Sequence, residues 1–164
     1  GLGCAEQYGV LDQIDFLVGT FGKAIASIGG YIICDPIIRD YLINKMRPLI
    51  FSTALPPISM AWSDFIFNKV LNMQQQRQHL AEISHFLQQA VIAKGFSSPS
   101  SSHIIPIIVG ESNAAIEKAR YVQQQGFYAM PVRPPTVPQN SSRLRISLTS
   151  MVQKAELEKL VECL

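Results

Sequence analysis

The sequence is poor in cysteine, and its cysteines lie too far apart to form a recognisable framework. Only three occur in 164 residues, Cys4, Cys34 and Cys163, and no C-x-x-C pair is present. An odd number at this spacing indicates neither a disulfide framework nor a zinc site. We therefore expect free or buried thiols, which are typical of proteins in a reducing cytoplasm.

Charged side chains are also scarce, and neither sign forms a run. They make up 16% of the chain, the formal net charge is +2, and the lysines and arginines are scattered. A nucleic-acid surface needs a basic patch or stripe, so a nucleic-acid partner is not expected. The hydrophobic fraction of 48% is typical of a globular domain or of part of a larger one.

No apolar run is long and uninterrupted enough to predict a membrane span. Residues 14–33 contain Asp15, Lys23 and several glycines, and residues 42–62 contain two cations and three prolines. The N-terminus also lacks the charged region of a secretory signal. Because the chain begins with Gly1 instead of Met, we expect it to be the tail of a longer protein.

The first part of the chain predicts two short strands and a helix. The apolar runs Ile14–Gly19 and Gly29–Cys34 are typical of buried strands in an α/β sheet. Asp35 and Pro36 then predict a helix start, with Asp as the N-cap and Pro at the first helical position. This helix should reach about Lys45.

A domain boundary is predicted at the Pro56-Pro57 pair, which breaks the chain between residues 1–57 and 58–164. The second part predicts a small α+β arrangement, with about three strands backed by helices. Pro106 suggests an edge strand, and Ser112 is the expected cap of the helix that follows. The expected helices cover residues 59–94 (as one helix or two), 112–126 and 154–163, and the expected strands cover 104–109, 127–132 and 144–148.

Lys23 lies in a glycine-flanked turn at the end of the first predicted strand, in the tetrapeptide TFGK. Small neighbours let a flat ring approach the backbone, and partial burial favours the neutral amine that forms a Schiff base. The Thr20 hydroxyl could donate to a phosphate oxygen. On the tetrapeptide alone, an ordinary surface lysine remains an open alternative. A P-loop is excluded, because Leu17 and Ala24 stand where its first glycine and its Ser or Thr are required.

Three blocks of the sequence, in order and spacing, resemble the α-oxoamine synthase family. They are DFLVGTFGKAIASIGGYI around Lys23, RPLIFSTALPP over residues 47–57, and MPVRPPTVPQNSSRLRISLTS over residues 130–150. Members are class II aminotransferase-like enzymes of fold type I that use pyridoxal 5'-phosphate (PLP) to condense an amino acid with an acyl-CoA. The resemblance implies an α/β fold in which residues 1–57 end the large PLP-binding domain and residues 58–164 form the small α+β C-terminal domain.

The RPPTVP and RLR segments are similar to those of the biotin-pathway branch of this family. That branch condenses L-alanine with pimeloyl-CoA, or pimeloyl carrier protein, to 8-amino-7-oxononanoate with loss of carbon dioxide. The family also implies a homodimer with its active site at the subunit interface. Two alternatives stay open: another α-oxoamine synthase, such as a glycine C-acetyltransferase, and a non-catalytic α+β module of the same ancestry.

The resemblance implies cofactor-binding roles for four residues. Lys23 matches the catalytic lysine that holds PLP as an internal aldimine and moves protons at the substrate Cα. Thr20 matches a phosphate ligand. Ser52 and Thr53 match a Ser-Thr pair whose second member reaches the phosphate of the neighbouring subunit's cofactor, and a helix cap is the open alternative for this pair. The family's glycine-rich phosphate loop, ring Asp and stacking His precede this chain, so the fragment alone is expected to be inactive.

The resemblance also implies that two residues bind the amino-acid substrate. Arg145 matches the clamp for the substrate carboxylate, a role that suits a planar and permanently charged guanidinium. Thr136 matches a residue beside that carboxylate. Arg143 shares the strand face of Arg145 and is interpreted as a surface residue. No metal site is expected, because the three histidines (His79, His85 and His103) match no ligand spacing.

Overall fold

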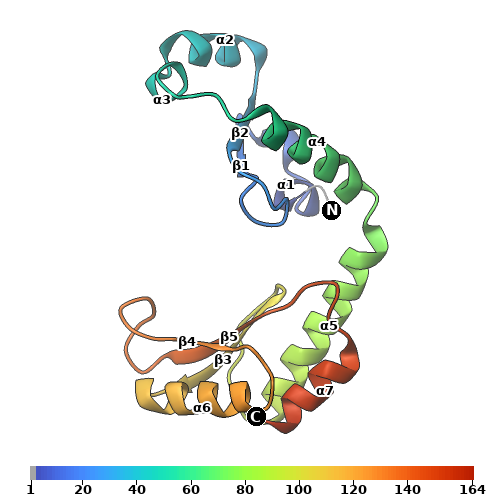
Figure 1. Ribbon diagram of the computed structural model, residues 1–164, viewed down its shortest axis with the longest axis vertical. Coiled ribbons are helices and arrows are strands. Elements are labelled where there is room, and N and C mark those ends of the chain that lie inside the picture. Colours follow the sequence, from blue (N-terminus) through green and yellow to red (C-terminus); the bar gives the residue numbers. More distant parts are fainter. Residues whose placement is uncertain (1–2) are drawn as a thin grey trace. The chain divides into compact units, whose positions relative to one another are not determined.

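The computed structural model describes residues 3–164, which divide into two units (Figure 1). The first ends at Gln74 and the second begins at Gln75. The predicted boundary at Pro57 does not coincide with this division, because helix α4 (Pro57–Leu71) belongs to the first unit. Trp62 on α4 donates a hydrogen bond to the carbonyl of Ala26, which ties the helix to the first unit.

The first unit contains the two predicted strands, paired as a short antiparallel ribbon. Phe16 lies opposite Cys34 at one end and Thr20 lies opposite Gly30 at the other. Its elements are α1 (Cys4–Gln7), a 3₁₀ turn (Leu11–Gln13), β1 (Phe16–Thr20), β2 (Gly30–Cys34), α2 (Pro36–Lys45), α3 (Arg47–Ile50) and α4.

The apolar side chains of β1 and β2 are not buried within residues 3–164. Val18 is 67% exposed and Ile33 is 58% exposed. Within residues 3–74 only Ala5 is buried, so the first unit has no core of its own. Two strands alone cannot cover their own apolar faces, and a two-stranded ribbon is marginally stable at best in water.

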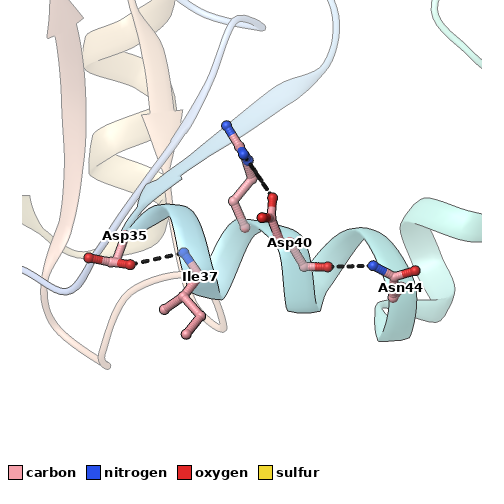
Figure 2. A network of polar contacts seen from close by, with 5 residues as sticks. Asp35, Ile37, Asp40 and Asn44 are labelled. Carbon is pink, nitrogen blue, oxygen red and sulfur yellow. Dashed lines mark hydrogen bonds and ion pairs between the residues drawn. The ribbon is translucent and has the colours of Figure 1, made fainter.

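Helix α2 begins as the sequence predicts. The Asp35 carboxylate accepts a hydrogen bond from the backbone N–H of Ile37 (2.9 Å), and Pro36 occupies the first turn (Figure 2). One of the helix's otherwise unpaired N–H groups is thereby satisfied. Further along, the Asn44 amide donates to the carbonyl of Asp40 (2.7 Å).

We expect Asp35→Ala to loosen α2 in the full-length protein, because the lost cap is worth about 1 kcal/mol. Amide hydrogen exchange in the first turn of α2 should accelerate about fivefold. Asp40→Ala is the matched control, since within residues 3–164 its exposed carboxylate pairs with the neighbouring Arg39 and caps no helix. Equal exchange in both variants would contradict the capping role.

The long helical region predicted over residues 59–94 is two helices, α4 and α5 (Gln74–Ala93). They are separated where α4 ends at Leu71, with Asn72 as its C-cap. No helix within residues 3–164 combines the length and the apolarity that a bilayer crossing requires.

The second unit contains a three-stranded antiparallel sheet in the order β3-β5-β4. Its elements are α5, β3 (Ile104–Gly110), α6 (Ser112–Gln124), β4 (Met130–Val132), β5 (Ser142–Ser147) and α7 (Lys154–Glu162). Strand β3 is an edge strand, as Pro106 predicts. The expected cap of α6 is wrong: Glu111 is the N-cap, and the Ser112 hydroxyl contacts that of Ser142 instead.

One face of this sheet and the helices enclose the core of the second unit (Figure 1). Leu87 and Val91 on α5 and Leu144 on β5 have no exposed surface. The rest of the core cluster lies on α5, β3, α6, β5 and α7, with Ala129 and Leu148 just outside β4 and β5. The opposite face of β5 is therefore the one that remains available for binding.

Candidate active site

Lys23 lies in the loop that joins β1 to β2, and backbone hydrogen bonds hold this loop in shape. The Lys23 carbonyl accepts from the N–H of Ala26 (2.9 Å), and the Phe21 carbonyl accepts from that of Ser27 (3.0 Å). The loop closes where the Phe21 N–H donates to the carbonyl of Gly29 (3.0 Å). The Lys23 side chain is exposed, so the partial burial expected of it is not provided by residues 3–164.

Thr20 stabilises the same loop. Its hydroxyl donates to the carbonyl of Gly29 (3.1 Å) and accepts from the N–H of Gly22 (3.2 Å). A hydroxyl has one hydrogen to donate. As a phosphate ligand, Thr20 would therefore have to exchange the Gly29 carbonyl for a phosphate oxygen.

The glycines beside the loop allow its strands to pack closely. A Cβ at Gly19 would lie 2.3 Å from the Tyr31 ring, and one at Gly30 would lie 2.9 Å from the Gly19 carbonyl oxygen. Phe21 packs on the same Tyr31, with ring centroids 5.3 Å apart. A larger residue at Gly30 would therefore push the two strands apart, whereas one at Gly19 would require the Tyr31 ring to move.

Ser52 and Thr53 lie in an exposed segment between α3 and α4. The Ser52 hydroxyl makes a long hydrogen bond to the Thr53 carbonyl (3.4 Å). The helix-cap interpretation of this pair is wrong, because α4 begins at Pro57 with Pro56 as its N-cap. Both hydroxyls can therefore turn towards a ligand.

Arg145 projects from the face of β5 opposite the core. Leu144 and Ile146 on either side of it are buried, whereas Arg145 is exposed. Its cross-strand neighbours are Pro106 on β3 and Met130 on β4. The three strands contain no acidic residue, and no ion pair engages Arg145 within residues 3–164. The guanidinium is thus available to an anionic ligand.

Thr136 lies in the connection between β4 and β5, where it is exposed. Its backbone N–H donates to the Arg133 carbonyl (3.0 Å), as in a turn. Arg143 differs from the expected surface residue: it is half-buried, and its Nε donates to the carbonyl of Ser141 (2.9 Å). The Ser141 hydroxyl in turn donates to the Pro138 carbonyl (2.7 Å), so Arg143 braces the connection that carries Thr136.

The candidate residues therefore fall into two groups, one on each unit. Lys23, Thr20, Ser52 and Thr53 belong to the first unit, and Arg145 and Thr136 belong to the second. One further residue was passed over in the sequence: Trp62, whose indole N–H donates to the Ala26 carbonyl in the Lys23 loop (3.0 Å). The only signal for it was that this is the single tryptophan of the chain.

Residues 4–164 match the family model described as aminotransferase class I and II. The chain belongs to this family. The 8-amino-7-oxononanoate synthase of Haemophilus ducreyi is 53% identical over 165 residues, which are 100% of this chain and 43% of that protein. The chain thus spans less than half the length of the curated relatives it matches.

Solved structures of this family share the fold. Serine palmitoyltransferase from Sphingomonas wittichii superposes with a TM-score of 0.92 and 28% identity, over 99% of this chain and 42% of that one. The 8-amino-7-oxononanoate synthase from Francisella tularensis has a TM-score of 0.79 and 25% identity, over 90% of this chain and 44% of that one. The predicted fold class is confirmed. The cofactor of the family is PLP, which serine palmitoyltransferase structures contain.

Proposed function

We propose that the full-length protein is an 8-amino-7-oxononanoate synthase, which condenses L-alanine with pimeloyl-CoA or pimeloyl carrier protein. The observation that carries the proposal is an exposed lysine in a glycine-flanked loop after β1, in a chain 53% identical to a synthase of that name. The chain is only 28% identical to serine palmitoyltransferase, so the same chemistry on that enzyme's substrates is the less well supported alternative.

The side chains of the first unit fit PLP. An amine that is free of ion pairs within residues 3–164 suits the cofactor's aldehyde, and the hydroxyls of Thr20, Ser52 and Thr53 suit its phosphate. Lys23 would hold the cofactor covalently, and Thr53 would reach the phosphate across a subunit interface. When bound, PLP supplies an electron sink for the negative charge that develops on the amino acid Cα.

The chain's own residues would orient the amino acid and move its protons. Arg145 would bind the carboxylate of alanine through a bidentate pair, with Thr136 beside it. This pairing would fix the orientation of the amino acid through its carboxylate. Lys23 would take the Cα proton and later return one to the product. The alanine Cα bonds to the thioester carbon, the thiol of CoA or of the carrier protein leaves, and the alanine carboxyl group departs as carbon dioxide.

A homodimer in the cytoplasm is part of this proposal. The apolar side chains left exposed on the first unit support burial against further protein, whether the rest of the same polypeptide or a second subunit. The three cysteines are all free, which suits a reducing compartment.

The proposal is tested by product analysis with the full-length protein. We expect 8-amino-7-oxononanoate from L-alanine and pimeloyl-CoA, and much less product from glycine with acetyl-CoA or from serine with palmitoyl-CoA. Mass spectrometry of the three reactions separates the products. Faster turnover of either other pair would replace the proposal with another α-oxoamine synthase, and no product from any pair would favour the non-catalytic alternative.

The 164-residue chain by itself should be inactive and should self-associate. It spans less than half the length of its relatives, and its β1-β2 ribbon exposes apolar side chains on an unpaired edge. Light scattering should detect dimers or larger aggregates, and PLP should bind without saturation. A monodisperse monomer that forms 8-amino-7-oxononanoate would contradict this expectation.

A further inference from the structure

The Lys23 loop contains a residue in an unfavourable backbone conformation. Ala26 has a φ of +50°, in the left-handed region that residues with a Cβ rarely adopt. Such strain persists only where surrounding contacts impose it, and it is concentrated at functional sites. The contacts that impose it here are therefore informative about how Lys23 is held.

Those contacts come from the loop itself and from helix α4, which lies far from the loop in sequence. Both polar groups of the Ala26 backbone are engaged: its N–H donates to the Lys23 carbonyl (2.9 Å), and its C=O accepts from Nε1 of Trp62 (3.0 Å). The next residue is bound to the same helix, because the Ser63 hydroxyl lies 2.8 Å from that of Ser27. Ser63 is fixed in turn by donating to the Ser59 carbonyl (2.8 Å).

We infer that Trp62 is a positioning residue for Lys23: its indole N–H holds the Ala26 peptide in the left-handed conformation that closes the lysine turn. A single residue, Ala26, connects the indole to the lysine backbone: its C=O accepts from Trp62 and its N–H donates to the Lys23 carbonyl. Releasing the indole would therefore let Ala26 relax and the Lys23 amine move. Packing is a separate role of the same side chain, since the Trp62 and Phe65 rings lie 6.0 Å apart. The inference rests on the proposed function of Lys23.

The test compares variants of the full-length enzyme loaded with PLP. Trp62→Phe keeps an aromatic ring at this position and removes the indole donor. We expect kcat to fall about three- to tenfold, the effect of one lost hydrogen bond, while KM for alanine changes less than about twofold. Ser63→Ala should also lower kcat, because it removes the contact with the Ser27 hydroxyl, and alanine still favours the helix. Asn68→Ala is the control on α4, because in the described part of the chain its amide bonds to Asp64 of the same helix.

A double variant separates positioning from packing. Glycine adopts the left-handed region without a Cβ penalty, so Ala26→Gly should restore most of the kcat lost in Trp62→Phe. Additive losses, or a Trp62→Phe enzyme with wild-type kcat, would overturn the inference. A wild-type protein without the visible absorbance of lysine-bound PLP would overturn both the inference and the proposed function. If the wild type had the normal absorbance and Trp62→Phe kept the wild-type kcat, the positioning role of Trp62 would be wrong and the proposed function would stand.

Discussion

Replacing Lys23 by alanine should abolish the visible absorbance of lysine-bound PLP and nearly all turnover of the full-length enzyme. The side chain has two tasks in the proposed reaction, since it holds the cofactor and moves the Cα proton. Positioned acid–base catalysis alone contributes about 10²- to 10⁴-fold, so kcat should fall by at least that factor. Absorbance spectroscopy and a product assay measure the two effects on the same sample.

The matched control is Lys69→Ala, which removes an equal charge from the exposed surface of α4 in the same unit. It should retain the spectrum and the turnover of the wild type. Lys23→Arg should fail as Lys23→Ala does, because a guanidinium stays protonated and cannot act as the nucleophile. A Lys23→Ala enzyme with an unchanged spectrum would show that another amine holds the cofactor.

Replacing Arg145 by alanine should weaken the binding of alanine far more than that of the acyl donor. A charge-assisted hydrogen bond contributes about 1.5–3 kcal/mol, so the apparent affinity for alanine should fall by about one to two orders of magnitude. Arg145→Lys should restore only part of it, because an ammonium lacks the two parallel donors of a guanidinium. Steady-state kinetics with each substrate varied in turn gives both constants.

Arg120→Ala is the control for this prediction, because Arg120 is an exposed cation on α6 of the same unit. This variant tests whether the loss of a positive charge elsewhere on the second unit is enough to change the KM for alanine. A change confined to the acyl-donor constant in Arg145→Ala would assign the guanidinium to a different substrate group. If Arg120→Ala and Arg145→Ala raised the KM for alanine equally, Arg145 would not be the residue that binds the carboxylate.

The sequence predicted those elements whose signals are local. Asp35 and Pro36 specify the start of α2 through contacts within the first turn, and the helix spans the expected residues. Pro106 restricts β3 to an edge, which the sheet order confirms. Ser112 shows the limit of such signals: its hydroxyl contacts Ser142 from another element instead of capping its own helix.

The remaining features depend on contacts between distant segments. The division after Gln74 follows from α4 binding the Lys23 loop through Trp62, a contact that no periodicity encodes. Burial of β1 was inferred from its apolar composition, yet burial also requires a partner surface that residues 3–164 do not provide. The candidate side chains follow from family motifs, because the residues that would surround them lie on both units or outside residues 3–164.

The central claim is that Lys23 holds the cofactor, and one measurement tests it directly. Full-length protein is loaded with PLP and treated with borohydride, which makes the lysine linkage permanent, and its peptides are then mapped by mass spectrometry. We expect a phosphopyridoxyl group on the peptide that contains Lys23, at close to one per subunit. Labelling of a different lysine, or no labelling of a folded protein, would contradict it.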